Sequence, residues 1–153
     1  NTVHYFLPEL RKSVSIPILS IIEEVTKKVV QNKLKRVGLL ATTTTIKQKL
    51  YETKLNKFGI DIIVPSKKFQ KVIIKIIRNI IAGRIRKKDI LNFKLIIEDL
   101  KLKGAQAVIL GCTDLPIILD NENSNIEILD SVNILSEAAA DMAYGEYNEI
   151  PTS

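Results

Sequence analysis

The strongest constraint on the fold is a regular alternation between short apolar segments and longer amphipathic segments. The short segments are near-continuous runs of apolar residues, as expected for strands that are buried on both faces of a sheet. They cover residues 36–41 (RVGLLA), 61–64 (DIIV), 107–110 (AVIL) and 126–130 (IEILD). Helical stretches come between and after them. This order predicts an α/β fold: a mostly parallel sheet with helices on both faces.

The clearest predicted helix follows Ser66, a suitable N-cap residue, and ends before Gly83. Its apolar side chains form one stripe at helical spacing: Phe69, Val72, Ile73, Ile76, Ile77, Ile80 and Ile81. Further helices are expected over residues 4–14, 22–32, 45–57, 88–103 and 131–144. We expect Ser131 to cap the last of these helices. A fifth short apolar segment, residues 16–20 (IPILS), is also strand-like.

The composition is that of a folded domain rather than a disordered tail, since 46% of the 153 residues are hydrophobic and 26% are charged. Lysines interrupt every long isoleucine-rich stretch, so no apolar run reaches the roughly 18 residues that a membrane span needs. With one cysteine and one histidine, we expect neither a disulfide framework nor a metal site. The single cysteine is typical of a reducing compartment, and we expect a cytoplasmic protein.

Charge is distributed unevenly along the chain. Residues 1–103 carry all 23 Lys and Arg against 8 Asp and Glu, whereas residues 104–153 carry 9 acids and no Lys or Arg. The net charge of +15 in the first portion is compatible with a nucleic-acid face. We favour solvated helix faces, because Lys71, Lys75 and Arg78 alternate with isoleucines at helical spacing and no arginine-rich or aromatic-interleaved patch accompanies the charge.

Cys112 is the first candidate site residue, because ligands in parallel α/β sheets bind beyond the carboxyl ends of the strands. It lies between Gly111 and Thr113, directly after the predicted strand 107–110. Backbone N–H groups and a helix N-terminus at this place would lower the pKa of the thiol and favour the thiolate, which can act as nucleophile, base or metal ligand. The alternative, a small buried apolar residue, stays open.

A run of four threonines, Thr42–Thr45, follows the predicted strand 36–41. Its hydroxyls and backbone amides can hold a carboxylate or phosphate at a helix N-terminus, or can simply cap that helix. Asn1 and Thr2 could also bind a carboxylate, with a ragged chain terminus as the alternative. His4 is a conceivable partner of Cys112 in nucleophilic catalysis, but no third, orienting residue can be identified.

Four motifs, taken in order, resemble those of the aspartate/glutamate racemase family, and in particular its aspartate racemase branch. They are NTVHYFLPEL, IPILSIIEE, GLLATTTTIKQKLYE and VILGCTDLPIIL, and together they span nearly the whole chain. The resemblance implies a cofactor-independent isomerase of amino-acid metabolism that does not use pyridoxal phosphate. It also implies a small amino-acid substrate, aspartate or glutamate, and a homodimer, which is common among family members.

The resemblance further implies two-base catalysis, in which one residue removes the Cα proton of the substrate and another returns a proton to the opposite face. Cys112 would be one of the two bases. The substrate carboxylate would be held by Asn1, Thr2, Thr42, Thr45 and Thr113. Asp114 would orient the site or the substrate ammonium group.

In the family fold, two similar α/β domains enclose the site between them. On this template residues 1–33 are a remnant of the first domain, residues 34–124 form the second, and residues 125–153 return to the first. The family motif places the other base, a Cys or Thr, immediately before Asn1. We therefore expect the chain to be a piece of a longer protein that lacks the first base, and to be inactive alone.

Two departures from the family pattern are Thr44 and Lys49, since the family usually has glycine at both positions. If the first of these glycines has a positive φ, Thr44 would strain the loop. Aspartate racemases also often carry a lysine near residues 81–84 for the distal carboxylate, where this chain offers only Arg78 or Arg84. Substrate preference therefore stays open.

Two other functions also stay open. An enzyme like maleate isomerase or arylmalonate decarboxylase has the same fold and a similarly placed cysteine, but the threonine-rich loop and the NTVH motif argue against it. A non-catalytic basic fragment that binds nucleic acid would use residues 1–103, and its binding would weaken steeply as salt rises.

Overall fold

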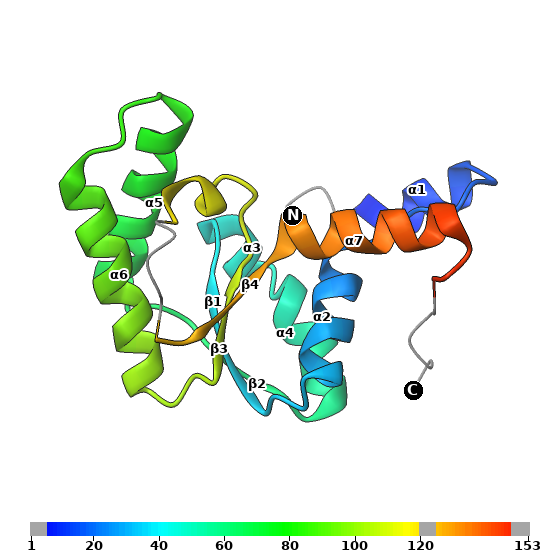
Figure 1. Cartoon of the computed structure of the whole chain (residues 1–153), viewed down its shortest axis with the longest axis horizontal. Helices are drawn as coiled ribbons and strands as arrows, with labels where there is room; N and C mark the ends of the chain where they lie inside the picture. The colour runs from blue at the N-terminus through cyan, green and yellow to red at the C-terminus, as the bar shows by residue number, and fades with distance from the viewer. Residues whose placement is uncertain (1–5, 120–124, 148–153) are drawn as a thin grey trace.

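The computed structural model describes residues 6–119 and 125–147, and its centre is a four-stranded parallel sheet with helices on both faces (Figure 1). The strands are β1 (Arg36–Leu40), β2 (Asp61–Ile63), β3 (Ala107–Leu110) and β4 (Glu127–Asp130). Their order in the sheet is β2-β1-β3-β4, and every neighbouring pair is parallel. The predicted α/β class and the four predicted strands are confirmed.

The two inner strands explain the apolar runs from which the sheet was predicted. All four residues of β3 and the last four of β1 are buried, because helices cover both sides of the sheet. The register pairs Leu40 with Leu110, so β1 and β3 end side by side at the same edge. β4 pairs with β3 and begins two residues into the 125–153 segment that we assign to the first domain. The domain boundaries themselves stay a prediction.

One face of the sheet is covered by α5 (Lys67–Ile81) and α6 (Lys87–Leu102), two consecutive helices (Figure 1). The predicted caps of α5 are confirmed: Ser66 Oγ accepts a hydrogen bond from the Phe69 N–H at 3.3 Å, and Gly83 has a φ of 63° just beyond the helix. The predicted stripe of α5 supplies four buried isoleucines: Ile73, Ile76, Ile77 and Ile80. They form a core with α6 and with the strand residues that point to this face.

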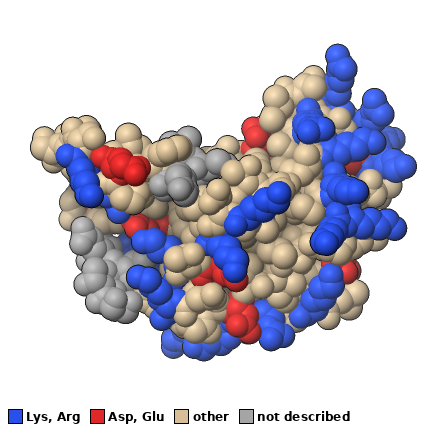
Figure 2. Space-filling view, turned by 180° about the vertical axis from the view of Figure 1, so that it is seen from behind, with Lys and Arg blue, Asp and Glu red and all other residues tan. Residues whose placement is uncertain are grey.

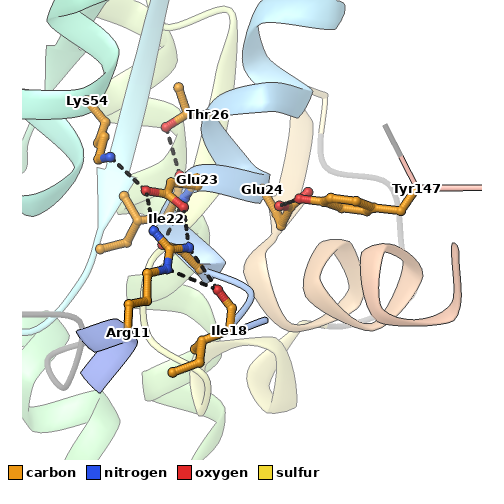
Figure 3. Close-up of polar contacts among 9 residues, drawn as sticks. Arg11, Ile18, Ile22, Glu23, Glu24, Thr26, Lys54 and Tyr147 are labelled. Atoms are coloured by element: carbon orange, nitrogen blue, oxygen red, sulfur yellow. Dashed lines mark hydrogen bonds and ion pairs between the residues drawn. The ribbon is translucent and has the colours of Figure 1, made fainter. Parts of the chain in front are cut away.

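The other face is covered by helices from separate parts of the chain: α2 (Ile21–Gln31), α4 (Leu50–Leu55) and α7 (Ser131–Tyr144). α7 packs against α2 and extends away from the sheet, as Figure 1 shows, and α1 (Leu7–Ser13) precedes α2. Polar side chains connect these segments (Figure 3). Glu23 on α2 accepts from Arg11 at 2.8 Å and from Lys54 of α4 at 2.7 Å, and buried Glu24 accepts from the Tyr147 hydroxyl at 2.5 Å.

The single helix predicted over residues 45–57 is wrong, because the segment is broken into three. α3 (Thr43–Lys47) and α4 are separated by Lys49, whose φ of 50° lies in the left-handed region, and a 3-10 turn over Asn56–Phe58 follows α4. A left-handed backbone is costly for lysine and free for glycine, which is the residue that the family pattern has at this position. Thr44 lies within α3 and has no positive φ, so it brings no backbone strain of the kind considered from sequence.

The predicted strand over residues 16–20 is also wrong. Ile16 is 70% exposed, Pro17 has no N–H to donate, and the Ile18 carbonyl accepts from the Arg11 guanidinium rather than from a strand. Ser131 is not the cap of α7 either. Asp130 is the cap, since its carboxylate accepts from the Val132 N–H at 2.8 Å.

No helix among the residues that the structure describes is both long enough and apolar enough to cross a membrane.

Candidate active site

The candidate site lies at the edge where β1 and β3 end. Beyond the last paired residues, the Gly111 N–H still donates to the Leu40 carbonyl at 2.8 Å. Two segments follow the strands: residues 41–45, which we call the threonine loop and which include the first turn of α3, and residues 111–114. They start next to each other, as the topology of a parallel sheet requires.

Gly111 is required by close packing at this edge. A Cβ atom added at residue 111 would lie 2.9 Å from Leu39 Cδ1, 3.1 Å from Tyr51 Cε2 and 3.2 Å from Ala41 Cβ. The ring of Tyr51 and the Cβ of Ala41 cannot rotate out of the way. A larger residue here would push β3 away from β1 and from α4, and would displace the Cys112 that follows.

Cys112 is 7% exposed, and its thiol donates to Asp114 Oδ2 across 3.6 Å. Burial raises the pKa of the Cys112 thiol; the backbone N–H of Asp114 lowers it, and the Asp114 carboxylate raises it further. The expected lowering of this pKa is therefore wrong in direction. The main reason is burial of the thiol; in addition, only a four-residue 3-10 turn, Leu115–Ile118, follows the loop, and so short a turn has little dipole to stabilise a thiolate.

The threonine loop places two of its predicted residues together. Thr42 caps α3, with its Oγ1 accepting from the Thr45 N–H at 3.3 Å and lying 3.0 Å from Thr45 Oγ1. Thr45 is fully buried and Thr42 is half-buried. The capping interpretation is thus correct for Thr42, and its hydroxyl remains at the same sheet edge as Cys112.

The remaining predicted residues fall into two groups. Thr113 is exposed and Asp114 is half-buried, and both continue the loop from Cys112 beyond β3. Asn1, Thr2 and His4 lie outside the described residues. The structure therefore brings together Cys112 and Asp114 by a hydrogen bond, and Thr42 and Thr45 by another, on adjacent loops.

Three polar residues that sequence reasoning missed also lie at this edge. Ser131, directly after β4, donates to the Leu110 carbonyl at 2.7 Å, and Gln70 donates to the Ala41 carbonyl at 2.9 Å. The third residue is Tyr51, and burial raises its pKa far above the usual value. A hydrogen bond with Ser131 opposes this rise, whereas the charge of a Cys112 thiolate would add to it. Of these three residues, only Ser131 could have been identified from the sequence, since it directly follows a predicted strand just as Cys112 does.

The polar groups at this edge are hydroxyl, thiol, carboxylate and amide groups. Within residues 6–119 and 125–147, no group of three or more His, Cys, Asp or Glu side chains is arranged to hold a metal ion. The arrangement can exchange a proton through Cys112 and can donate hydrogen bonds to an anionic group through the threonines.

Comparison with protein families gives a match over residues 1–139 to the model described as Asp/Glu/Hydantoin racemase. Among curated proteins, the broad-specificity amino-acid racemase RacX of Bacillus subtilis is 28% identical over 138 residues, which are 90% of this chain and 60% of RacX.

Two solved structures have the same arrangement of elements. One, described as a putative Asp/Glu racemase from Yersinia pestis, has a TM-score of 0.86 at 27% identity. The other, an aspartate racemase homologue from Pyrococcus horikoshii, has a TM-score of 0.82 at 28% identity. Each match covers 94% of this chain and 64% of the solved chain, so this chain spans about three fifths of the length of these relatives.

Proposed function

The chain belongs to the Asp/Glu/hydantoin racemase family, and from this premise we propose that its protein is a cofactor-independent amino-acid racemase of the aspartate/glutamate type. The observation that carries the proposal is the position of Cys112. It is a buried thiol in a Gly-Cys-Thr-Asp loop at the carboxyl end of an inner strand, next to a loop of threonine hydroxyls.

Cys112 is one of the two bases in this proposal. Because burial raises its pKa, the thiol is protonated at neutral pH and is suited to deliver a proton to the Cα of a carbanionic substrate. In the reverse direction the thiolate removes the Cα proton, and the Asp114 N–H stabilises that thiolate. The other base comes from the residue that the family motif places before Asn1, on the opposite side of the substrate.

The substrate carboxylate takes hydrogen bonds from Thr113 and from Thr42 and Thr45; the family motif adds Asn1 and Thr2, which lie outside the described residues. These donors stabilise the negative charge that spreads onto the carboxylate as the Cα proton leaves. Asp114 is half-buried and accepts a hydrogen bond from the Cys112 thiol. In this proposal its carboxylate orients the thiol or the substrate ammonium.

We propose aspartate as the first substrate to test and glutamate as the second. The support is that a structurally similar protein is described as an aspartate racemase homologue and that a curated relative is described as a broad-specificity amino-acid racemase.

The test is the exchange of the substrate Cα proton with solvent. The protein encoded by the complete open reading frame is incubated with L-aspartate or L-glutamate in D2O. Loss of the Cα–H signal is followed by proton NMR, and inversion is followed by circular dichroism. We expect exchange and racemisation in the wild type, and a loss of about 10²-fold or more in Cys112→Ala, which has no acid or base on that face.

A matched control is Ile117→Ala, because Ile117 is 63% exposed in the turn that follows the Cys112 loop. This variant should retain its activity and the circular dichroism of a folded protein. Full activity in Cys112→Ala would overturn the proposed role. Turnover of maleate without exchange of aspartate would instead identify the isomerase-like enzyme of the same fold.

A further inference from the structure

The turn between α5 and α6 forms a protruding tip, which we define as residues 78–91. Figure 1 shows it rising past the edge at which the strands end. Its backbone is held firmly: the Arg84 N–H donates to the Asn79 carbonyl at 2.8 Å, and Gly83 turns the chain with a φ of 63°. No atom lies within 4 Å of a Cβ placed on Gly83, so the outer side of the turn is open.

The tip presents positive charge without exposed acids. Its five cations, all exposed, are Arg78, Arg84, Arg86, Lys87 and Lys88. None of the five has an ion-pair partner among the residues that the structure describes. The one acid of the tip, Asp89, is 5% exposed and accepts from Asn79 Nδ2 and from the Arg86 N–H, both at 3.0 Å. Figure 2 shows Lys and Arg gathered over the α5 and α6 side of the molecule.

Large aliphatic side chains are exposed among these cations. Ile81 is 70% exposed, Leu91 is 62% exposed and Ile85 is 38% exposed. The neighbouring Ile80 and Phe93 are buried in the core, so the exposed residues belong to the outward face of the same rigid hairpin. The tip therefore combines exposed cations with exposed apolar side chains.

The partner of such a surface must supply negative charge and an apolar layer together. A second copy of the tip is disfavoured, because five unpaired cations would face five others. A nucleic acid supplies phosphates, but the exposed apolar residues are aliphatic and offer no aromatic ring on which bases could stack. An anionic bilayer offers both features, with lipid phosphates for the Arg and Lys side chains and the acyl boundary for the aliphatic ones.

We propose that the α5–α6 tip is a docking surface for anionic lipid bilayers. The cations bind the headgroups, and Ile81, Ile85 and Leu91 enter the boundary between headgroups and acyl chains. The tip includes Arg78 and Arg84, which the family pattern also offers for the distal carboxylate of the substrate, so vesicle binding is measured in the absence of substrate.

The first test is co-sedimentation of the 153-residue chain with large unilamellar vesicles of phosphatidylcholine, with and without phosphatidylglycerol. We expect binding only to vesicles that contain phosphatidylglycerol, and weaker binding at high salt. Arg84→Gln/Arg86→Gln should reduce the partition coefficient by about 10-fold or more. Ile81→Ser/Leu91→Ser should reduce it by about 10-fold, because two aliphatic anchors are lost. The control Leu102→Ser, at an 81%-exposed residue outside the tip, should bind like the wild type.

The second test exploits the absence of tryptophan from the chain. Leu91→Trp introduces a single reporter at an exposed position, so folding should be unaffected. We expect its fluorescence to shift to shorter wavelength when phosphatidylglycerol vesicles are added, while Leu102→Trp should show no shift.

Three outcomes would overturn the proposal: no binding to anionic vesicles at low salt, equal binding of both double variants and the wild type, or no shift for Leu91→Trp. Binding to duplex DNA that falls in Arg84→Gln/Arg86→Gln but not in Ile81→Ser/Leu91→Ser, without vesicle binding, would assign the tip to nucleic acid instead.

Discussion

The two faces of the sheet are covered in different ways. The face under α5 and α6 is closed by one continuous stretch of chain, and its core consists largely of isoleucine and leucine. The opposite face is closed by α2, α4 and α7, which come from three separate parts of the sequence. Charged and hydroxyl groups join these parts: Glu23 to Arg11 and Lys54, and Glu24 to Tyr147 (Figure 3).

The difference shows what each kind of contact contributes. A continuous helical hairpin needs only a matching apolar stripe, because the chain connection already limits where its two helices can lie. Helices that are distant in sequence can slide or rotate on an apolar surface, and directional polar contacts restrict them to one arrangement. We therefore expect the stability contributed by the α5–α6 face to be insensitive to pH and salt, and that of the other face to depend on both.

The largest effect should come from the core of the α5–α6 face. Ile96→Ala removes a fully buried side chain of α6 and leaves a cavity, so the free energy of unfolding should fall by about 2–5 kcal/mol. Urea unfolding followed by circular dichroism measures this loss, and it should be the same at neutral and alkaline pH. The adjacent control Leu95→Ala, at a 62%-exposed residue, should change stability by less than about 0.5 kcal/mol.

A pH-dependent effect is expected on the other face from Tyr51. Because burial raises the pKa of Tyr51 in the folded state, the unfolded chain loses this proton first as the pH rises. The contribution of Tyr51 is therefore complete below about pH 10 and decreases above it by about 1.4 kcal/mol per pH unit.

The variant Tyr51→Phe should remove this alkaline loss. At neutral pH it should cost about 1 kcal/mol through the hydrogen bond with Ser131. Unfolding curves at neutral and strongly alkaline pH test both statements, with Tyr144→Phe as the control because Tyr144 is 83% exposed. An alkaline loss of equal size in Tyr51→Phe and wild type would contradict the assigned role.

The smallest effect should come from the ion pair between Arg11 and Glu23. Burial raises the pKa of Glu23, but hydrogen bonds and charges from Arg11 and Lys54 outweigh it and lower the pKa overall. This contribution is present above about pH 4.3 and is lost as the pH falls through the lowered pKa of the folded state. Arg11→Ala should therefore cost about 0.5 kcal/mol at neutral pH, since the Arg11 side chain is 42% exposed.

The effect of Arg11→Ala on stability should depend on salt concentration and on pH. The cost of Arg11→Ala should shrink at high salt and in acid, because both weaken the pair in the wild type. Lys57→Ala is the matched control, since Lys57 is exposed and has no ion-pair partner among the described residues. A cost for Arg11→Ala that does not change with salt would indicate lost packing rather than lost charge.

The sequence was sufficient to predict the strands of the sheet and the α5–α6 hairpin that follows β2. Unbroken apolar runs identify β1 and β3 because both of their faces are buried, and the isoleucine stripe identifies α5 because one face of that helix is buried. The sequence was insufficient where a local pattern is compatible with more than one structure. The IPILS segment is apolar but does not pair in the sheet. Lys49 interrupts a helix although lysine has a high helix propensity.

For the candidate site, the sequence by itself determined which residues follow the strands, and therefore which residues meet at one edge of a parallel sheet. Cys112 and the threonine loop were identified in this way. Only the tertiary structure decided the environment of the thiol. The pKa of Cys112 rises because it is buried and lies beside Asp114, and Gly111 is necessary because Tyr51 packs against it. Burial and packing at this site depend on residues that are far apart in the chain, such as Tyr51 and Gly111, which are 60 residues apart. A local sequence pattern does not predict contacts between such distant residues.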